Sequence, residues 1–74
     1  MAVSSLERDA LVSLARSLTR EGHYDDAQAI WAGLAHLEPG MEEPFRGLAV
    51  IYLHKQDWER SVVFAKAALD RSSS

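Results

Sequence analysis

Apolar residues recur at spacings of three and four along most of the chain, and polar residues occupy the positions between them. That spacing places the apolar side chains on one face of an α-helix. Four such stretches follow one another, separated by short segments that contain glycine, proline or aspartate. The pattern therefore predicts an all-α fold of four helices.

The first two helices have recognisable ends. Ser4 and Glu7 have the spacing of a capping box, so we expect the first helix to begin after Ser4. Gly22 suits the left-handed position that ends a helix. The second helix is predicted from about Asp25, and it ends before Pro39, which cannot continue a helix.

The third helix is predicted from about Glu42 to Lys55, and the fourth begins after Asp57, a good N-cap residue. Residues 48–53 are apolar on all sides of the third helix. Such a helix is buried on most faces or presented to a partner. The short loops favour antiparallel neighbours.

A shift of the chain by 34 residues superimposes large residues on large ones and small residues on small ones. A constant period of this length indicates a helical repeat, with a generic four-helix bundle and a coincidental period as the alternative. The superimposed pairs are Leu11 and Phe45, Leu14 and Leu48, Ala15 and Ala49, Leu18 and Tyr52, Tyr24 and Trp58, Ala27 and Ser61, and Ile30 and Phe64.

Two glycines lie inside predicted helices, Gly33 and Gly47. Glycine costs about 1 kcal/mol relative to alanine at such positions. We therefore expect a close helix contact at both.

Composition narrows the function classes. The 74 residues include no cysteine, carry a net charge of −3 and are 47% hydrophobic. Without a basic stripe the chain is a poor partner for nucleic acid, and no apolar run is long enough to cross a membrane. The first residues lack the pattern of a secretory signal, so we expect a cytoplasmic protein.

No residue pattern indicates catalysis. The three histidines do not share a helical face at metal-ligand spacing, so no metal site is predicted. Ser61 has no evident triad partners, and no glycine-rich phosphate loop is present. We predict a protein that is not an enzyme, with no catalytic residue, no cofactor and no small-molecule substrate.

Residues 22–34, which are followed by Glu38 and Pro39, resemble the second half of a tetratricopeptide (TPR) repeat. Leu11, Leu14, Ala15 and Leu18 match the pattern of its first helix. The second copy departs from the pattern, with Gln56 in place of the glycine, Ser61 in place of the small alanine and Ala65 in place of the aromatic residue.

This resemblance implies two antiparallel helix pairs in a fragment of a right-handed α-solenoid. The whole chain, 1–74, would be a single domain, with repeat one at about 8–41 and repeat two at about 42–71. Residues 72–74 would form a frayed tail.

In TPR proteins the first helix of each pair lines a concave face, which binds polypeptides. The resemblance implies a groove with an apolar floor and a basic rim, suited to a segment with apolar anchors and acidic flanks. Its expected residues are Val12, Arg16, Arg20, Arg46, Val50 and Leu53. The alternative is that Val50 and Leu53 belong to the core. The lysine and asparagine clamp that grips heat-shock-protein tails is not matched, so we do not expect chaperone-tail binding.

TPR arrays usually finish with a covering helix, which the second pair lacks here. We therefore expect an uncovered apolar edge that includes Tyr52, Val63 and Ala67, and that forms a homodimer or is capped by a partner.

The predicted function is a protein–protein interaction module that binds a polypeptide segment in the groove or at the open end. The specific prediction is a small TPR-type chaperone of type III secretion, whose repeats have a similar run to Gly22-His23-Tyr24-Asp25-Asp26-Ala27 followed by Gly47-Leu48-Ala49. The alternative is a homo-oligomeric scaffold, or a fragment of a longer TPR array, without a dedicated client.

Overall fold

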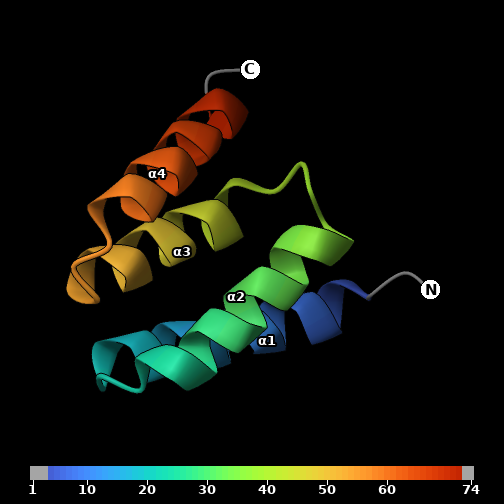
Figure 1. Ribbon diagram of the computed structural model, residues 1–74. Helices are drawn as coiled ribbons and strands as arrows, with labels where there is room; N and C mark the ends of the chain where they lie inside the picture. The colour runs from blue at the N-terminus through green and yellow to red at the C-terminus, as the bar shows by residue number, and fades with distance from the viewer. Residues whose placement is uncertain (1–3, 73–74) are drawn as a thin grey trace.

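The computed structural model describes residues 4–72, which form four helices and no strand (Figure 1). The helices are α1 (Ser5–Arg20), α2 (Tyr24–Leu37), α3 (Glu42–His54) and α4 (Trp58–Ser72). The predicted all-α class is confirmed, and each described boundary lies within a residue or two of its prediction. Of the expected tail, Ser72 is the last residue of α4, and residues 73–74 lie outside the described part.

The predicted N-caps form. The Ser4 hydroxyl accepts a hydrogen bond from the Glu7 amide at 3.1 Å and donates to the Glu7 carboxylate at 3.0 Å. The Asp57 carboxylate accepts from the Arg60 amide at 3.2 Å. These bonds satisfy amides at the helix starts that have no partner within the helix, which is why α1 and α4 begin where they do.

The ends of α1 and α3 have the same backbone geometry. Gly22 ends α1 with φ of 84°, and Gln56, 34 residues later, ends α3 with φ of 62°. The amide two residues beyond each C-cap donates back into the helix in the same way: His23 to Leu18 at 2.8 Å, and Asp57 to Tyr52 at 2.9 Å. A left-handed residue followed by this bond is the Schellman helix ending. Gln56 thus adopts the conformation that glycine adopts most easily.

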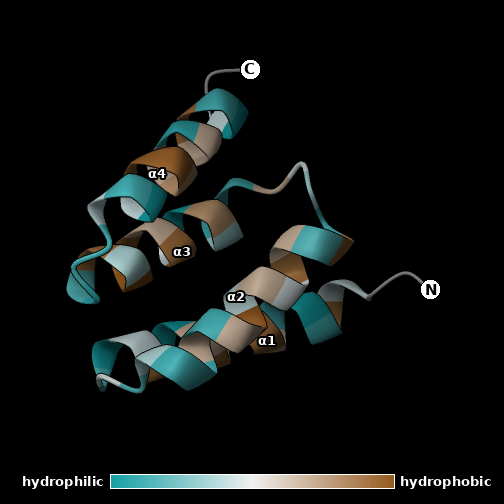
Figure 2. Cartoon of the chain, viewed as in Figure 1, coloured by the Kyte–Doolittle hydropathy of each residue, from teal (hydrophilic) through white to brown (hydrophobic). Residues whose placement is uncertain are grey.

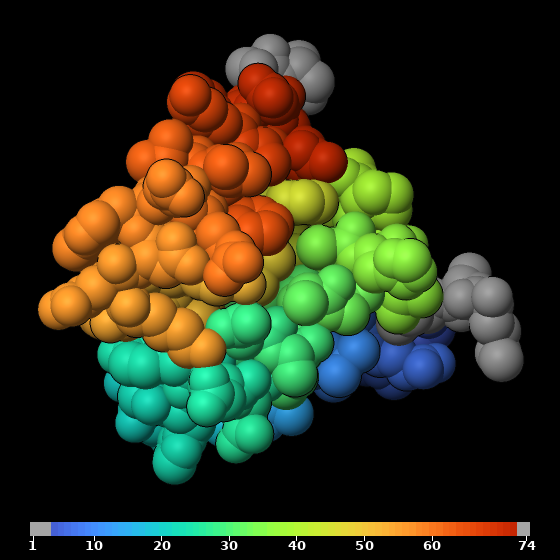
Figure 3. Space-filling view, in the orientation of Figure 1, coloured from blue at the N-terminus to red at the C-terminus, as the bar shows by residue number. Residues whose placement is uncertain are grey.

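The chain turns back at each of the three connections, and each helix packs on the one before it (Figure 1). Helix α1 also contacts α3. In the space-filling view α1 lies largely behind α2, and side chains of α2 and α4 make up much of the visible face (Figure 3).

The buried core lies between α1, α2 and α3, and α4 covers it from one side only. The core cluster consists of Val12, Ala15, Ala27, Trp31, Leu34, Leu48 and Ile51. Helix α4 has one fully buried residue, Ala68, and its Phe64 is half-buried against the core. The first three helices therefore hold most of the packing energy of the described chain.

The two helical glycines differ. A Cβ atom on Gly47 would lie 2.6 Å from Cδ2 and Nε1 of Trp31, so the close contact predicted there is confirmed. A Cβ atom on Gly33 would meet nothing within 4 Å, so the same prediction for Gly33 is wrong. Gly33 lies on the exposed side of α2, where no neighbouring helix approaches.

Candidate functional site

The structure divides the predicted groove into two hollows. The α1/α3 hollow has a volume of about 340 Å³ and the α3/α4 hollow about 370 Å³. Arg46 and Val50 of α3 line both, so they form a ridge between the two. Arg16 and Arg20 line only the first hollow, and Leu53 lines only the second.

Trp31 forms the floor of the α1/α3 hollow. Its indole Nε1 donates a hydrogen bond to the Thr19 hydroxyl at 3.2 Å, and that hydroxyl donates to the Ala15 carbonyl at 2.7 Å. The ring is only 2% exposed because it lies between α1 and the backbone of α3 at Gly47. These contacts hold the indole in one orientation, so the floor of the hollow is preformed.

The rim of the α1/α3 hollow is less basic than the sequence indicates. Arg16 forms an ion pair with Glu43 across the hollow, and Arg46 forms one with Glu42 on the same helix. Arg20 has no carboxylate partner within residues 4–72 and donates only a long hydrogen bond to the Ser17 hydroxyl, at 3.5 Å. Because exposed ion pairs are weak, Arg16 and Arg46 can still exchange partners, but Arg20 carries the unneutralised charge.

Val12 does not line the groove, contrary to the prediction. It is buried in the core cluster with Ala15 and Ala27, on the side of α1 that packs against α2. Val50 and Leu53 are 37% and 50% exposed, so they lie at the surface rather than in the core. The apolar floor predicted from three residues therefore consists of Val50 and Trp31 in one hollow, and Leu53 belongs to the other.

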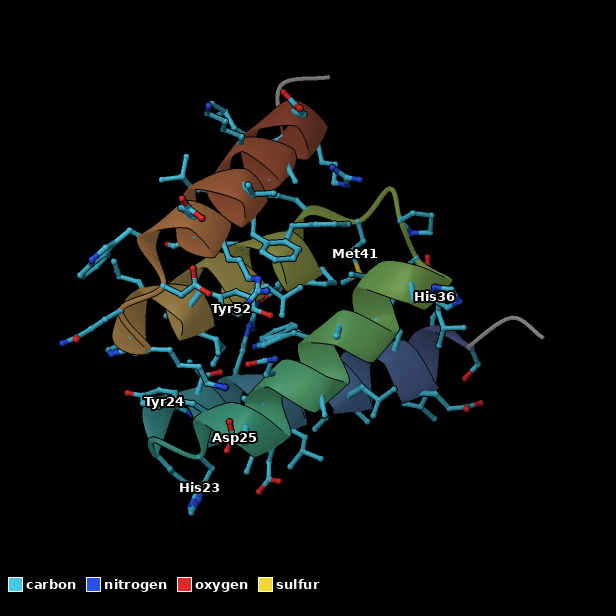
Figure 4. The ribbon with its side chains drawn as sticks, viewed as in Figure 1. His23, Tyr24, Asp25, His36, Met41 and Tyr52 are labelled. Carbon is cyan, nitrogen blue, oxygen red and sulfur yellow. The ribbon has the colours of Figure 1, made fainter. Side chains whose placement is uncertain are left out.

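The predicted open-end residues also lie elsewhere. The Tyr52 ring stacks on Phe64 at 5.5 Å and its hydroxyl accepts a hydrogen bond from the Gln28 amide at 3.3 Å, so it lies in the middle of the molecule between α3, α2 and α4 (Figure 4). Neither Val63 nor Ala67 lines the α3/α4 hollow. Successive helical residues are rotated by about 100°, so a shift of one position moves a side chain to another face.

The residues that do form the outer edge of α4 were missed. They are Trp58, Val62, Ala65 and Leu69, all exposed, and below we call them the α4 stripe. Figure 2 shows hydrophobic residues along the α4 ribbon. The spacing of four, three and four was visible in the sequence, and it would have identified this face if it had been used in place of analogy.

Lys55 connects α3 to the start of α2, on the opposite side of the molecule from the α4 stripe. Its ammonium donates to the Asp25 carboxylate at 2.6 Å and to the Gln28 side-chain carbonyl at 2.7 Å. The hydrogen bond and the positive charge of Lys55 lower the pKa of the Asp25 carboxyl below its ordinary value.

The histidines do not come together. His23 and His36 lie at opposite ends of α2, and the His54 ring stacks on Tyr24 at 4.7 Å (Figure 4). Residues 4–72 contain no group of three histidine, aspartate or glutamate side chains that could hold a metal ion. None of the helices described is both long and apolar enough to cross a membrane.

Comparison with known proteins adds no relative. No family model matches the chain, and neither a curated protein nor a solved structure matches it. Functional inference therefore depends on the geometry of the two hollows and on the internal repeat.

Proposed function

We propose that the protein is a TPR-like interaction module that binds a segment of another polypeptide in the α1/α3 hollow. The proposal includes the finer architecture, in which α1–α2 and α3–α4 are two antiparallel repeats of a right-handed solenoid. It is supported by the identical Schellman endings of α1 and α3, which lie one 34-residue period apart.

The observation that carries the proposal is the charge and polarity of the hollow. An exposed apolar side chain, Val50, and the indole floor of Trp31 lie beside Arg20, which has no carboxylate partner in residues 4–72. A polypeptide with an apolar anchor and a neighbouring acidic side chain would bury the first and pair with the second. This ligand chemistry matches the expectation from the sequence, with Arg20 replacing the three-arginine rim.

Selection from a library of random peptides with the full 74-residue chain as bait would test the proposal. We expect enrichment of peptides that combine a large apolar residue with aspartate or glutamate. Arg20→Glu should weaken the selected peptides about tenfold by charge reversal, whereas Arg20→Lys should retain most of the affinity. Val62→Glu, on the far side of α4, is the control outside the hollow.

Two outcomes would count against the proposal. One is a selection that enriches no common pattern. The other is a set of peptides that bind Arg20→Glu as well as the unchanged protein, since that result would place them elsewhere.

The proposed chaperone role in type III secretion is a narrower form of this function, motivated by the repeat resemblance alone. A client chaperone gains stability from its client, because binding only the native state raises the apparent stability. A scaffold without a client is stable alone, and its melting temperature rises with its own concentration. Thermal melts at several protein concentrations, with and without a selected peptide, distinguish the two.

A further inference from the structure

Helix α3 covers one face of α2. The Tyr24 ring stacks on His54 of α3 at 4.7 Å, and Trp31 lies against Gly47 of α3. Side chains on this face of α2 are half-buried or buried, and they have helical spacing of four, three and four: Tyr24, Gln28, Trp31 and Ala35.

The α4 stripe is the same set of positions 34 residues later, and no described helix covers it. Trp58 is 59% exposed, compared with 2% for Trp31 in the covered set. The uncovered set is also the more apolar at two positions, because Val62 replaces Gln28 and Leu69 replaces Ala35. Large apolar side chains left exposed in a row indicate a surface that is buried in an assembly.

The stripe continues into the α3/α4 hollow. Ala65 and Leu69 line that hollow from α4, and Val50 and Leu53 line it from α3. The hollow has the same register as the seat of α3 on α1 and α2, displaced by one period. A helical layer placed on the stripe would therefore fill the hollow as well.

Two opposite charges border the stripe. Glu59 and Lys66 are seven residues apart on the same edge of α4, and neither makes a hydrogen bond or an ion pair in the described part of the chain. In the covered set, the residue equivalent to Glu59 is Asp25, and it pairs with Lys55 of the covering helix at 2.6 Å. By the same geometry, Glu59 lacks the cation that a covering helix would supply.

The charge pattern identifies the covering helix. In an antiparallel pair of identical helices, residues at equal distances from the centre of the contact lie opposite each other. The midpoint between Glu59 and Lys66 differs from the midpoint of the stripe by one residue, which is about 1.5 Å along the helix axis. A second α4 in antiparallel orientation would thus present Lys66 to Glu59 and Glu59 to Lys66.

We propose that two copies of the chain pair face to face through the α4 stripe and the α3/α4 hollow, with their α4 helices antiparallel. Such a contact is isologous, so it closes as a dimer and does not propagate into a filament. In this register Val62 faces Ala65 of the second copy, and Trp58 faces Leu69 of the second copy. A larger residue meets a smaller one in the central layer, which allows the helix axes to approach.

Sedimentation equilibrium of the full chain across a wide concentration range would test the dimer. We expect a monomer–dimer equilibrium, which Val62→Glu should weaken by about a hundredfold because it buries two carboxylates in an apolar layer. Val63→Glu is the matched control: Val63 is the next residue, is 61% exposed against 51% for Val62, and does not line the hollow. It should leave the dimer unchanged.

Charge reversal tests the antiparallel register. Glu59→Lys and Lys66→Glu should each weaken the dimer about tenfold, because each places like charges opposite one another twice. An equal mixture of the two variants should form heterodimers of normal affinity, since both pairs are then attractive. Far-ultraviolet circular dichroism of each variant checks that α4 is intact, because Glu59 also lies in its first turn.

A chain that remains monomeric at every concentration would overturn the proposal and leave the stripe to a different polypeptide. Equal effects of Val62→Glu and Val63→Glu would overturn the choice of surface, and a mixture that fails to form heterodimers would overturn the register. The proposal does not depend on peptide binding in the α1/α3 hollow: Arg20→Glu should leave the dimer intact, and Val62→Glu should leave the selected peptides bound.

Discussion

Helices α2 and α4 occupy equivalent positions in the two copies of the repeat, but they differ in what lies against them. The face of α2 that contains Trp31 is covered by α3, whereas the equivalent face of α4 is open to solvent. The buried copy is built around a tryptophan packed on a glycine, and the open copy has Ala65 where the tryptophan would be. The comparison shows that one pattern of positions serves as core in one place and as surface in another.

The largest expected effect comes from exchanging the two tryptophans for alanine. Trp31→Ala should lower the free energy of unfolding by about 3–5 kcal/mol, because it opens a cavity in the core and removes the bond to Thr19. Trp58→Ala in dilute, monomeric protein should change it by less than about 0.5 kcal/mol. Urea denaturation measured at low concentration checks both, and similar losses for the two variants would contradict the distinction between covered and open faces.

The two helical glycines give an effect of opposite sign. Gly47→Ala should cost about 1–3 kcal/mol because the added methyl group meets the Trp31 indole. Gly33→Ala should instead raise the stability by up to about 1 kcal/mol, since its Cβ meets nothing and alanine is the better helix former. Thermal unfolding of both variants side by side measures the difference. A stabilising Gly47→Ala would show that the α2–α3 contact is looser than described.

The helix endings give a smaller and reciprocal effect. Gln56→Gly should stabilise the protein by up to about 1 kcal/mol, because it removes the cost of a left-handed residue with a Cβ atom. Gly22→Gln should cost about the same amount at the equivalent position of the first copy. Chemical denaturation checks the pair, and an unchanged stability in both variants would mean that the two turns do not hold the described conformation.

The smallest effect concerns the Asp25–Lys55 pair, which the open copy lacks. Folding lowers the pKa of the Asp25 carboxyl, so the ionised form favours the folded state. This contribution is fully present above the ordinary pKa of an aspartate and is lost as the pH falls through the lower folded value. Titration of the carboxyl by nuclear magnetic resonance should show the lowered pKa, and Lys55→Met should return it toward normal. A Glu59 pKa that falls with rising protein concentration would detect the equivalent pairing in the dimer.

Local features of the fold were predictable from the residues alone. The Ser4 and Asp57 caps and the stop at Gly22 depend on contacts within a few residues, and each formed as predicted. The contact at Gly47 also followed, because a glycine inside a helix needs a reason. The same argument was wrong for Gly33, since a neighbouring helix must approach from the correct side and none does.

The candidate site was only partly predictable. Arg16, Arg20, Arg46 and Val50 do surround a hollow, but Val12 packs into the core and Tyr52 lies between helices. A position on an amphipathic helix specifies a direction to within a wide sector, and the neighbouring helix decides whether that sector is covered. The pairing of Arg16 with Glu43, 27 positions away, was likewise outside the reach of local reasoning.

The sequence by itself determined the four helices, their caps and the 34-residue repeat, because these features depend on backbone bonds and on spacings of three and four along the chain. The tertiary structure alone decided which copy of the repeated face is buried, how the arginines are neutralised and where the hollows lie. Those outcomes depend on the approach of residues that are distant in sequence, and the free energy of burial depends on what covers a side chain rather than on the side chain itself.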